Sequence, residues 1–197
     1  MSKISTYTSV SPALTDLMIG TDVSDSNATK NFSISDLFSL LKSNLSKGSF
    51  YHNVTQTAAA INTAYPMRFG STDTSNTSGF SIANDGSGNP TRITATNAGN
   101  YNLAFSAQLS KTGGAENTVD IWIRINGTDV PSSNTTVTLK ANANYVVAAW
   151  NFFVNLTAGQ YVEIMWATTD TNSSLLYAAS TALHPATPSV IATINQV

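Results

Sequence analysis

Two neighbouring stretches decide the fold of this chain: residues 97–110 read NAGNYNLAFSAQLS, and residues 119–127 read VDIWIRING. In both stretches, apolar side chains occupy every second position, which is the pattern of a β-strand with one face on a hydrophobic core. The second stretch ends on Asn126-Gly127, a strong signal for a two-residue hairpin turn, because both residues tolerate a positive φ. The sequence therefore predicts strands joined by tight turns.

Similar strand patterns recur from residue 50 to the C-terminus. Turn residues separate them roughly every 8–12 residues, without a helical period between them. About ten short strands of this kind predict an all-β fold, either a sandwich or a jelly roll. The further strands are expected at residues 67–69, 80–83, 92–96, 135–139, 145–154, 161–168, 175–179 and 190–194.

Aromatic residues of these strands are the main candidates for the core. The stretch 145–154 is apolar on both faces, so we expect it either at the centre of the sandwich or at a subunit interface. Trp122 alternates with the isoleucines of its strand and has three readings: an interface residue, an outer-face residue, or part of a glycan platform. Interface packing is favoured, because aromatic residues and Arg are enriched there. The residues expected in the core are Tyr101, Phe105, Trp150, Phe152 and Trp166.

Residues 1–48 have a different pattern. Strands are expected near residues 16–21 and 30–32, and Ser33 with Asp36 fits a capping box at the start of a helix. Gly48 is expected to end that helix. The region is too small to bury its own apolar face, so we expect it to dock on another protein. The apolar positions at helical spacing are Leu37, Phe38, Leu40, Leu41 and Leu45.

The composition excludes several classes of protein. Charged residues make up 10% of the 197 residues, against about 25% in ordinary soluble domains, and the net charge is −2. Binding to nucleic acid is therefore not expected, since it needs clustered Lys and Arg. No apolar run approaches the ~20 residues of a membrane span, and the first residues do not resemble a secretory signal. We expect no membrane insertion.

The candidate chemical groups are few, and the chain has no cysteine. Two histidines alone do not make a metal site, and no Gly-x-Ser-x-Gly motif accompanies them. A calcium ion near Asp85 stays an alternative to a simple turn. We expect no enzyme, no cofactor and no metal, and we interpret the acid pairs as solvated turn residues. The histidines and acid pairs are His52, His184, Glu116 with Asp120, and Glu163 with Asp170.

The second region resembles the complement-C1q-like, tumour-necrosis-factor-like jelly roll found at the tips of phage and bacterial fibres. The order and spacing of several segments carry this resemblance, although each segment alone is weak. Residues 19–37 also resemble the segments that open phage tail and fibre proteins. The segments of the second region are residues 97–108, 119–131, 149–152, 156–166 and 187–191.

This resemblance implies a homotrimeric bacteriophage fibre or appendage on the surface of the virion, made in the host cytoplasm. Residues 1–48 would attach it to capsid, portal or tail proteins, and residues 49–197 would form the head. The candidate receptor is a glycan or a protein of the host surface. The alternative is a protein that decorates or cements the capsid without a receptor.

The resemblance and the patterns together assign residues to two surfaces. The expected trimer interface contains Trp122, Arg124 and Phe153. The expected virion anchor contains Leu17, Ile19, Phe32, Leu37, Phe38 and Leu41.

Overall fold

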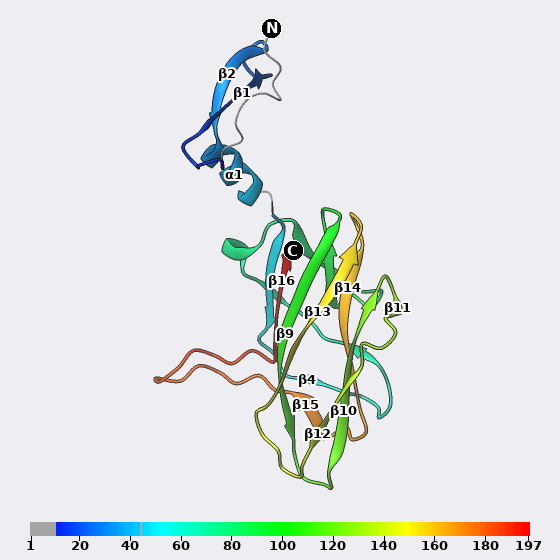
Figure 1. Cartoon of the computed structure of the whole chain (residues 1–197). Coiled ribbons are helices and arrows are strands. Elements are labelled where there is room, and N and C mark those ends of the chain that lie inside the picture. The colour runs from blue at the N-terminus through cyan, green and yellow to red at the C-terminus, as the bar shows by residue number, and fades with distance from the viewer. Residues whose placement is uncertain (1–10, 44) are drawn as a thin grey trace. The chain divides into compact units, whose positions relative to one another are not determined.

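The computed structural model describes residues 11–43 and 45–197. The chain divides into two compact units, Met1–Leu45 and Ser46–Val197 (Figure 1). The division lies three residues before the one expected at residue 48, because Lys47 already belongs to the first strand of the second unit.

The first unit is a hairpin followed by a helix, as predicted. Strands β1 (Leu17–Asp22) and β2 (Ala28–Ser33) pair in antiparallel register, and α1 spans Ile34–Ser43. The Ser33 hydroxyl accepts a hydrogen bond from the Asp36 amide at 3.0 Å and donates one to the Asp36 carboxylate at 2.6 Å. The side chains of the expected capping residues therefore do fix the start of the helix.

The end of the helix was predicted wrongly. α1 ends at Ser43, whereas Lys47 and Gly48 lie in β3 (Lys47–His52). A Cβ atom on Gly48 would lie 2.6 Å from the Phe50 ring and 3.1 Å from the Ile194 side chain. Gly48 thus serves the close approach of side chains in a sheet, and not the termination of a helix.

The second unit contains two antiparallel sheets. The β10 sheet has the order β11-β10-β14-β8-β7, with β12 on β10 and β5 on β14. The β9 sheet has the order β4-β15-β9-β16-β3-β6, with β13 on β9. A short 3₁₀ helix, η2, spans Thr74–Asn76. The remaining strands are β4 (Gln56–Thr57), β5 (Tyr65–Pro66), β6 (Ser71–Thr72), β7 (Phe80–Asn84), β8 (Pro90–Ala95), β9 (Gly99–Lys111), β10 (Asn117–Ile125), β11 (Thr128–Asp129), β12 (Thr135–Leu139), β13 (Val146–Leu156), β14 (Tyr161–Thr168), β15 (Ser173–Leu175) and β16 (Val190–Gln196).

The strand order confirms the predicted jelly roll. One sheet contains the series β3-β16-β9-β13, and the other contains β8-β14-β10-β12. The chain crosses from one sheet to the other between β8 and β9, β9 and β10, β12 and β13, and β13 and β14, whereas β7 to β8 and β10 to β12 stay within one sheet. Such repeated crossing is typical of a jelly roll. Figure 1 shows β9 and β16 in one layer, and β10 and β14 in the other.

The core lies between the sheets and contains the aromatic residues predicted for it. Tyr101, Phe105 and Trp166 are buried, and Trp150 and Phe152 are partly buried against them. The Phe105 ring meets the Trp150 ring edge-on, with 4.8 Å between their centroids. This edge-to-face packing is a favoured geometry for aromatic pairs.

Two expected strands differ from the structure. The strand expected at residues 67–69 is replaced by the shorter β5, which ends at Pro66. Met67 and Phe69 are nevertheless buried. The strand expected at residues 175–179 ends at Leu175, and residues 176–189 form an arm that leaves the sandwich (Figure 1). A single bridge between Ala178 and Thr187 pairs the two sides of this arm. No helix within residues 11–43 or 45–197 is long and apolar enough to cross a membrane.

His52 gives the fold a pH dependence. Its Nδ1 accepts a hydrogen bond from the Gly70 amide at 3.0 Å, which holds the imidazole in its neutral form. Burial, and then the charge of Arg68, lower the pKa of His52 below its ordinary value of 6.5. The unfolded chain therefore binds more protons near pH 6, so stability falls as the pH drops below about 6.5.

We expect the urea midpoint of the protein to decrease between pH 7 and pH 5, and this decrease to be largely lost in His52→Gln. His184→Gln is the matched control, because His184 lies in the exposed arm. A decrease of equal size in all three proteins would contradict this role of His52.

Candidate interaction faces of the jelly roll

The outer face of the β9 sheet carries one charged side chain, Lys47 of β3, along its four long strands. It consists of the side chains that alternate with the core positions of β13, β9, β16 and β3. Register places Ala149 opposite Ser106, and Ile191 on the other side of Ser106. The residues of this face include Lys47, Ser49, Tyr51, Asn102, Ala104, Ser106, Gln108, Val147, Ala149, Asn151, Phe153, Ile191 and Thr193.

Large apolar side chains are exposed on this face. Phe153 is 74% exposed, Val147 is 56% exposed and Ile191 is 39% exposed. Between them, Ala104 and Ser106 are small and leave a shallow hollow in the middle of the sheet. Apolar side chains around a depression lined by small residues suit close contact with another protein surface.

Several amides of this sheet already have partners on it. Asn151 donates to Asn102 across β13 and β9 at 2.8 Å, and Asn155 donates to Asn100 at 2.7 Å. Because these hydrogen bonds stay within the sheet, covering it would leave fewer polar groups without a partner.

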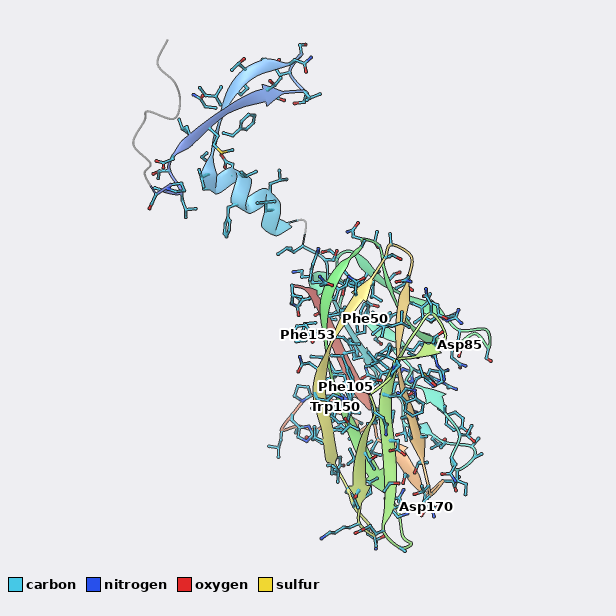
Figure 2. All side chains as sticks on the ribbon, turned by 45° about the vertical axis from the view of Figure 1, so that its right-hand side comes forward. Phe50, Asp85, Phe105, Trp150, Phe153 and Asp170 are labelled. Atoms are coloured by element: carbon cyan, nitrogen blue, oxygen red, sulfur yellow. The ribbon has the colours of Figure 1, made fainter. Side chains whose placement is uncertain are left out.

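β13 lies at an edge of the sheet, so the central position considered for it is wrong. Among the strands that the structure describes, it pairs with β9 alone. Its inward residues Trp150 and Phe152 face the core, whereas Phe153 points outward (Figure 2 labels Trp150 and Phe153). The described residues therefore leave the apolar side chains on the outer face of β13 exposed.

The outer face of the β10 sheet has a different chemistry. Asp129 of β11 accepts hydrogen bonds from the Trp122 Nε1 and the Arg124 Nε, both at 2.8 Å. The hydrogen bonds from Arg124 and then from Trp122 lower the pKa of the Asp129 carboxyl. These three residues hold one another in place, and the indole ring of Trp122 is fixed although it is only half-buried.

A hollow of about 370 Å³ lies beside the Trp122 ring. Asp120 is held there by hydrogen bonds from the Asn134 amide at 3.1 Å and from the Thr136 hydroxyl. The hollow is lined by Asn62, Ala64, Asp120, Trp122, Asn134, Ala167 and Thr168. Of these residues, Trp122 was predicted from the sequence to take part in an interaction. Asn62 and Asn134 lie in loops, where no alternation of apolar and polar residues could point to them.

The structure does not bring the three expected interface residues together. Trp122 and Arg124 lie on the outer face of the β10 sheet, and Phe153 lies on the outer face of the β9 sheet. Period-two alternation shows which residues of a strand share a side, but not to which sheet the strand belongs. The three residues therefore do not form a single patch on one protomer, and their place in a trimer interface stays a prediction.

The expected solvated acids differ from one another. Glu163 is only 5% exposed, so the interpretation as a solvated turn residue is wrong for it; it accepts a hydrogen bond from the Thr91 hydroxyl at 2.7 Å. Arg92 lies 3.7 Å from the same carboxylate. Asp170 binds the ammonium group of Lys111, which is fully buried.

Asp85 closes a turn. Its carboxylate accepts hydrogen bonds from the Ser87 amide at 2.8 Å and the Asn89 amide at 2.9 Å. Within residues 11–43 and 45–197, no three His, Cys, Asp or Glu side chains gather in a way that could hold a metal ion. The Asp85 carboxylate thus has a structural use in its own loop.

The expected anchor residues all have exposed side chains in the first unit. Ile19 is 77% exposed, and helix residues Leu37 and Leu41 are 38% and 59% exposed. Leu17, Phe32 and Phe38 are exposed as well. The packing of the helix and hairpin within the first unit thus leaves these apolar side chains exposed.

Comparison with solved structures finds 181 chains with a similar fold. No protein-family model and no curated protein sequence matches the chain. A crystal structure of murine APRIL at pH 8.5 is similar, with 8% sequence identity and a TM-score of 0.47. The match covers 78% of this chain and 100% of that chain.

Proposed function

We propose that this chain is a non-enzymatic structural protein of a bacteriophage particle: a homotrimeric fibre or appendage with an outward head for adhesion to the host surface. The observation that carries the proposal is the outer face of the β9 sheet with its exposed Phe153, Val147 and Ile191. The resemblance of residues 97–191 to fibre heads and of residues 19–37 to fibre openings supports the same proposal.

Copies of the chain itself are the proposed cover for this face. Lys47, at the start of β3, is the one charged side chain on this face along its four long strands, so a partner of strong charge would have little to pair with there. Exposed aromatic and aliphatic side chains together with amides resemble the mixture of apolar and polar groups in a subunit interface. Three copies around one axis close such a contact without leaving a free face.

The first unit is the proposed attachment to capsid, portal or tail proteins. Its helix and hairpin expose Leu17, Ile19, Phe38 and Leu41, and a unit this small cannot bury them internally. A trimer would present three such anchors together, which multiplies a weak contact into stable attachment. Three heads on one trimer would likewise bind a host surface more tightly than a single head.

Cryo-electron microscopy of the particle encoded by the same genome tests this function. We expect threefold knobs of density that fit the jelly roll and are attached through their N-terminal units. A particle preparation that contains the protein by mass spectrometry but lacks such density, or a particle without the protein, would overturn the proposal.

Adsorption competition separates adhesion from capsid decoration, which has the same fold and the same expected symmetry. If the head binds the host, excess purified protein should reduce phage adsorption to host cells. Undiminished adsorption, together with capsid-wide density, would favour the decorating role instead.

A further inference from the structure

We propose that the hollow beside Trp122 binds a neutral saccharide unit. The proposal deepens the proposed adhesive function and takes from it only that the ligand belongs to a host surface. It starts from the hollow of about 370 Å³ on the outer face of the β10 sheet, a volume within the range of small-ligand sites.

The Trp122 ring supplies an aromatic platform. Its Nε1 donates to the Asp129 Oδ1, and the Arg124 Nε donates to the same oxygen. The ring is therefore already fixed without a ligand. A fixed side chain loses little conformational entropy on binding. The negative face of an indole attracts the C–H groups that a pyranose ring presents on its apolar side.

Polar groups with spare hydrogen-bonding capacity surround the platform. Asp120 uses its Oδ1 for Asn134 and Thr136, while its Oδ2 has no hydrogen bond to any residue in the described part of the chain. The Asn134 Oδ1 and the side-chain amide of Asn62 likewise have no partner among residues 11–43 and 45–197. Carboxylate and amide groups of this kind accept from and donate to sugar hydroxyls.

The loop that carries Asn62 is held in place. Its backbone amide donates to the Thr168 carbonyl of β14 at 2.8 Å, and Asn62 adopts a left-handed φ of 52°. Asn tolerates this conformation better than most residues. The side-chain amide is therefore presented at the hollow from a backbone that β14 positions.

Charge selects the class of sugar. The hydrogen bonds that Asp120 accepts in the described part of the chain come from Asn134 and Thr136, neither of which is basic, and Arg124 is already paired with Asp129 at 2.8 Å. A ligand with a carboxylate, sulfate or phosphate would meet the Asp120 charge without compensation. A neutral hexose, deoxyhexose or N-acetylhexosamine avoids that penalty.

The hollow and the face proposed for subunit contact lie on different sheets. The hollow lies on the outer face of the β10 sheet, whereas the apolar face proposed for subunit contact belongs to the β9 sheet across the core. One surface would thus serve assembly, and the other would serve recognition.

Saturation-transfer NMR of the full chain with a panel of neutral mono- and disaccharides tests this inference, with sialic acid and glucose 6-phosphate as anionic probes. We expect millimolar binding of at least one neutral sugar. Trp122→Ala should weaken it by roughly tenfold or more, since truncated tryptophan anchors commonly cost that much. Asp120→Asn, which keeps the shape of the side chain, should weaken it less.

Tyr145→Ala is the matched control, because Tyr145 is also an exposed aromatic residue but does not line the hollow. Circular dichroism would verify that each variant is folded. Binding of no neutral sugar, binding of anionic sugars alone, or full binding by a folded Trp122→Ala variant would overturn the inference. Sugar binding by a protein absent from the particle would instead overturn the virion function and leave the saccharide site standing.

Discussion

Phe153→Asp is expected to convert the trimer into monomers at micromolar concentration. The wild-type ring is 74% exposed on the outer face of the β9 sheet and, in the proposed trimer, lies in the interface beside Asn102, its register partner on β9. Burying a carboxylate there without a partner costs several kcal/mol per ion, and a trimer would bury three. The charge meets no such penalty in the monomer, because the side chain is exposed there.

The matched control for this variant is Ile61→Asp. Ile61 is 51% exposed in the loop before β5, a strand of the opposite sheet, so the same new charge should leave the trimer intact. Sedimentation velocity measures both variants under one condition. A Phe153→Asp variant that keeps the mass of the wild type would show that copies do not meet through this face.

Asp170→Asn is expected to destabilise the jelly roll more than other substitutions of surface acids. Asp170 binds the ammonium group of Lys111, and the Lys111 side chain is fully buried (Asp170 is labelled in Figure 2). This hydrogen bond is the largest cause that lowers the pKa of the Asp170 carboxyl. Without the carboxylate, the buried cation loses its counter-charge, and the melting temperature should fall by roughly 5–10 °C.

Two variants test this assignment by differential scanning calorimetry. Lys111→Met removes the buried charge and leaves Asp170 to water, so it should cost much less than Asp170→Asn. Asp25→Asn breaks the ion pair between Asp25 and Lys30, whose side chains are 59% and 46% exposed, respectively. Because this pair is exposed, its loss should change the melting temperature little. Equal losses in Asp170→Asn and Asp25→Asn would contradict a special role for the buried pair.

Local patterns were sufficient to predict much of the fold. β9 and β10 follow the alternation of apolar and polar residues, and β12 and β14 have the predicted bounds. At Asn126-Gly127 the φ angles are 47° and 82°, and Arg124 pairs with Asp129 across the turn. These features depend on neighbours in sequence, which is why a single sequence contains them.

Features that depend on distant contacts were not predictable. Lys111 reads as a surface residue at a strand end, yet Asp170, 59 positions later, permits its burial. The placement of Trp122 and Phe153 on the outer faces of different sheets was not predictable for the same reason, because the sheet of each strand is set by pairing across long connections. The hollow at Trp122 likewise needs Asn62 and Asn134, which only the folded chain brings to β10.

Multi-angle light scattering of the purified full chain at micromolar concentration tests the central claim, a homotrimer of jelly rolls, most directly. With a chain mass of 20.8 kDa, three copies give about 62 kDa, and the account predicts that value. A stable mass of 20.8 kDa under the same conditions would contradict it.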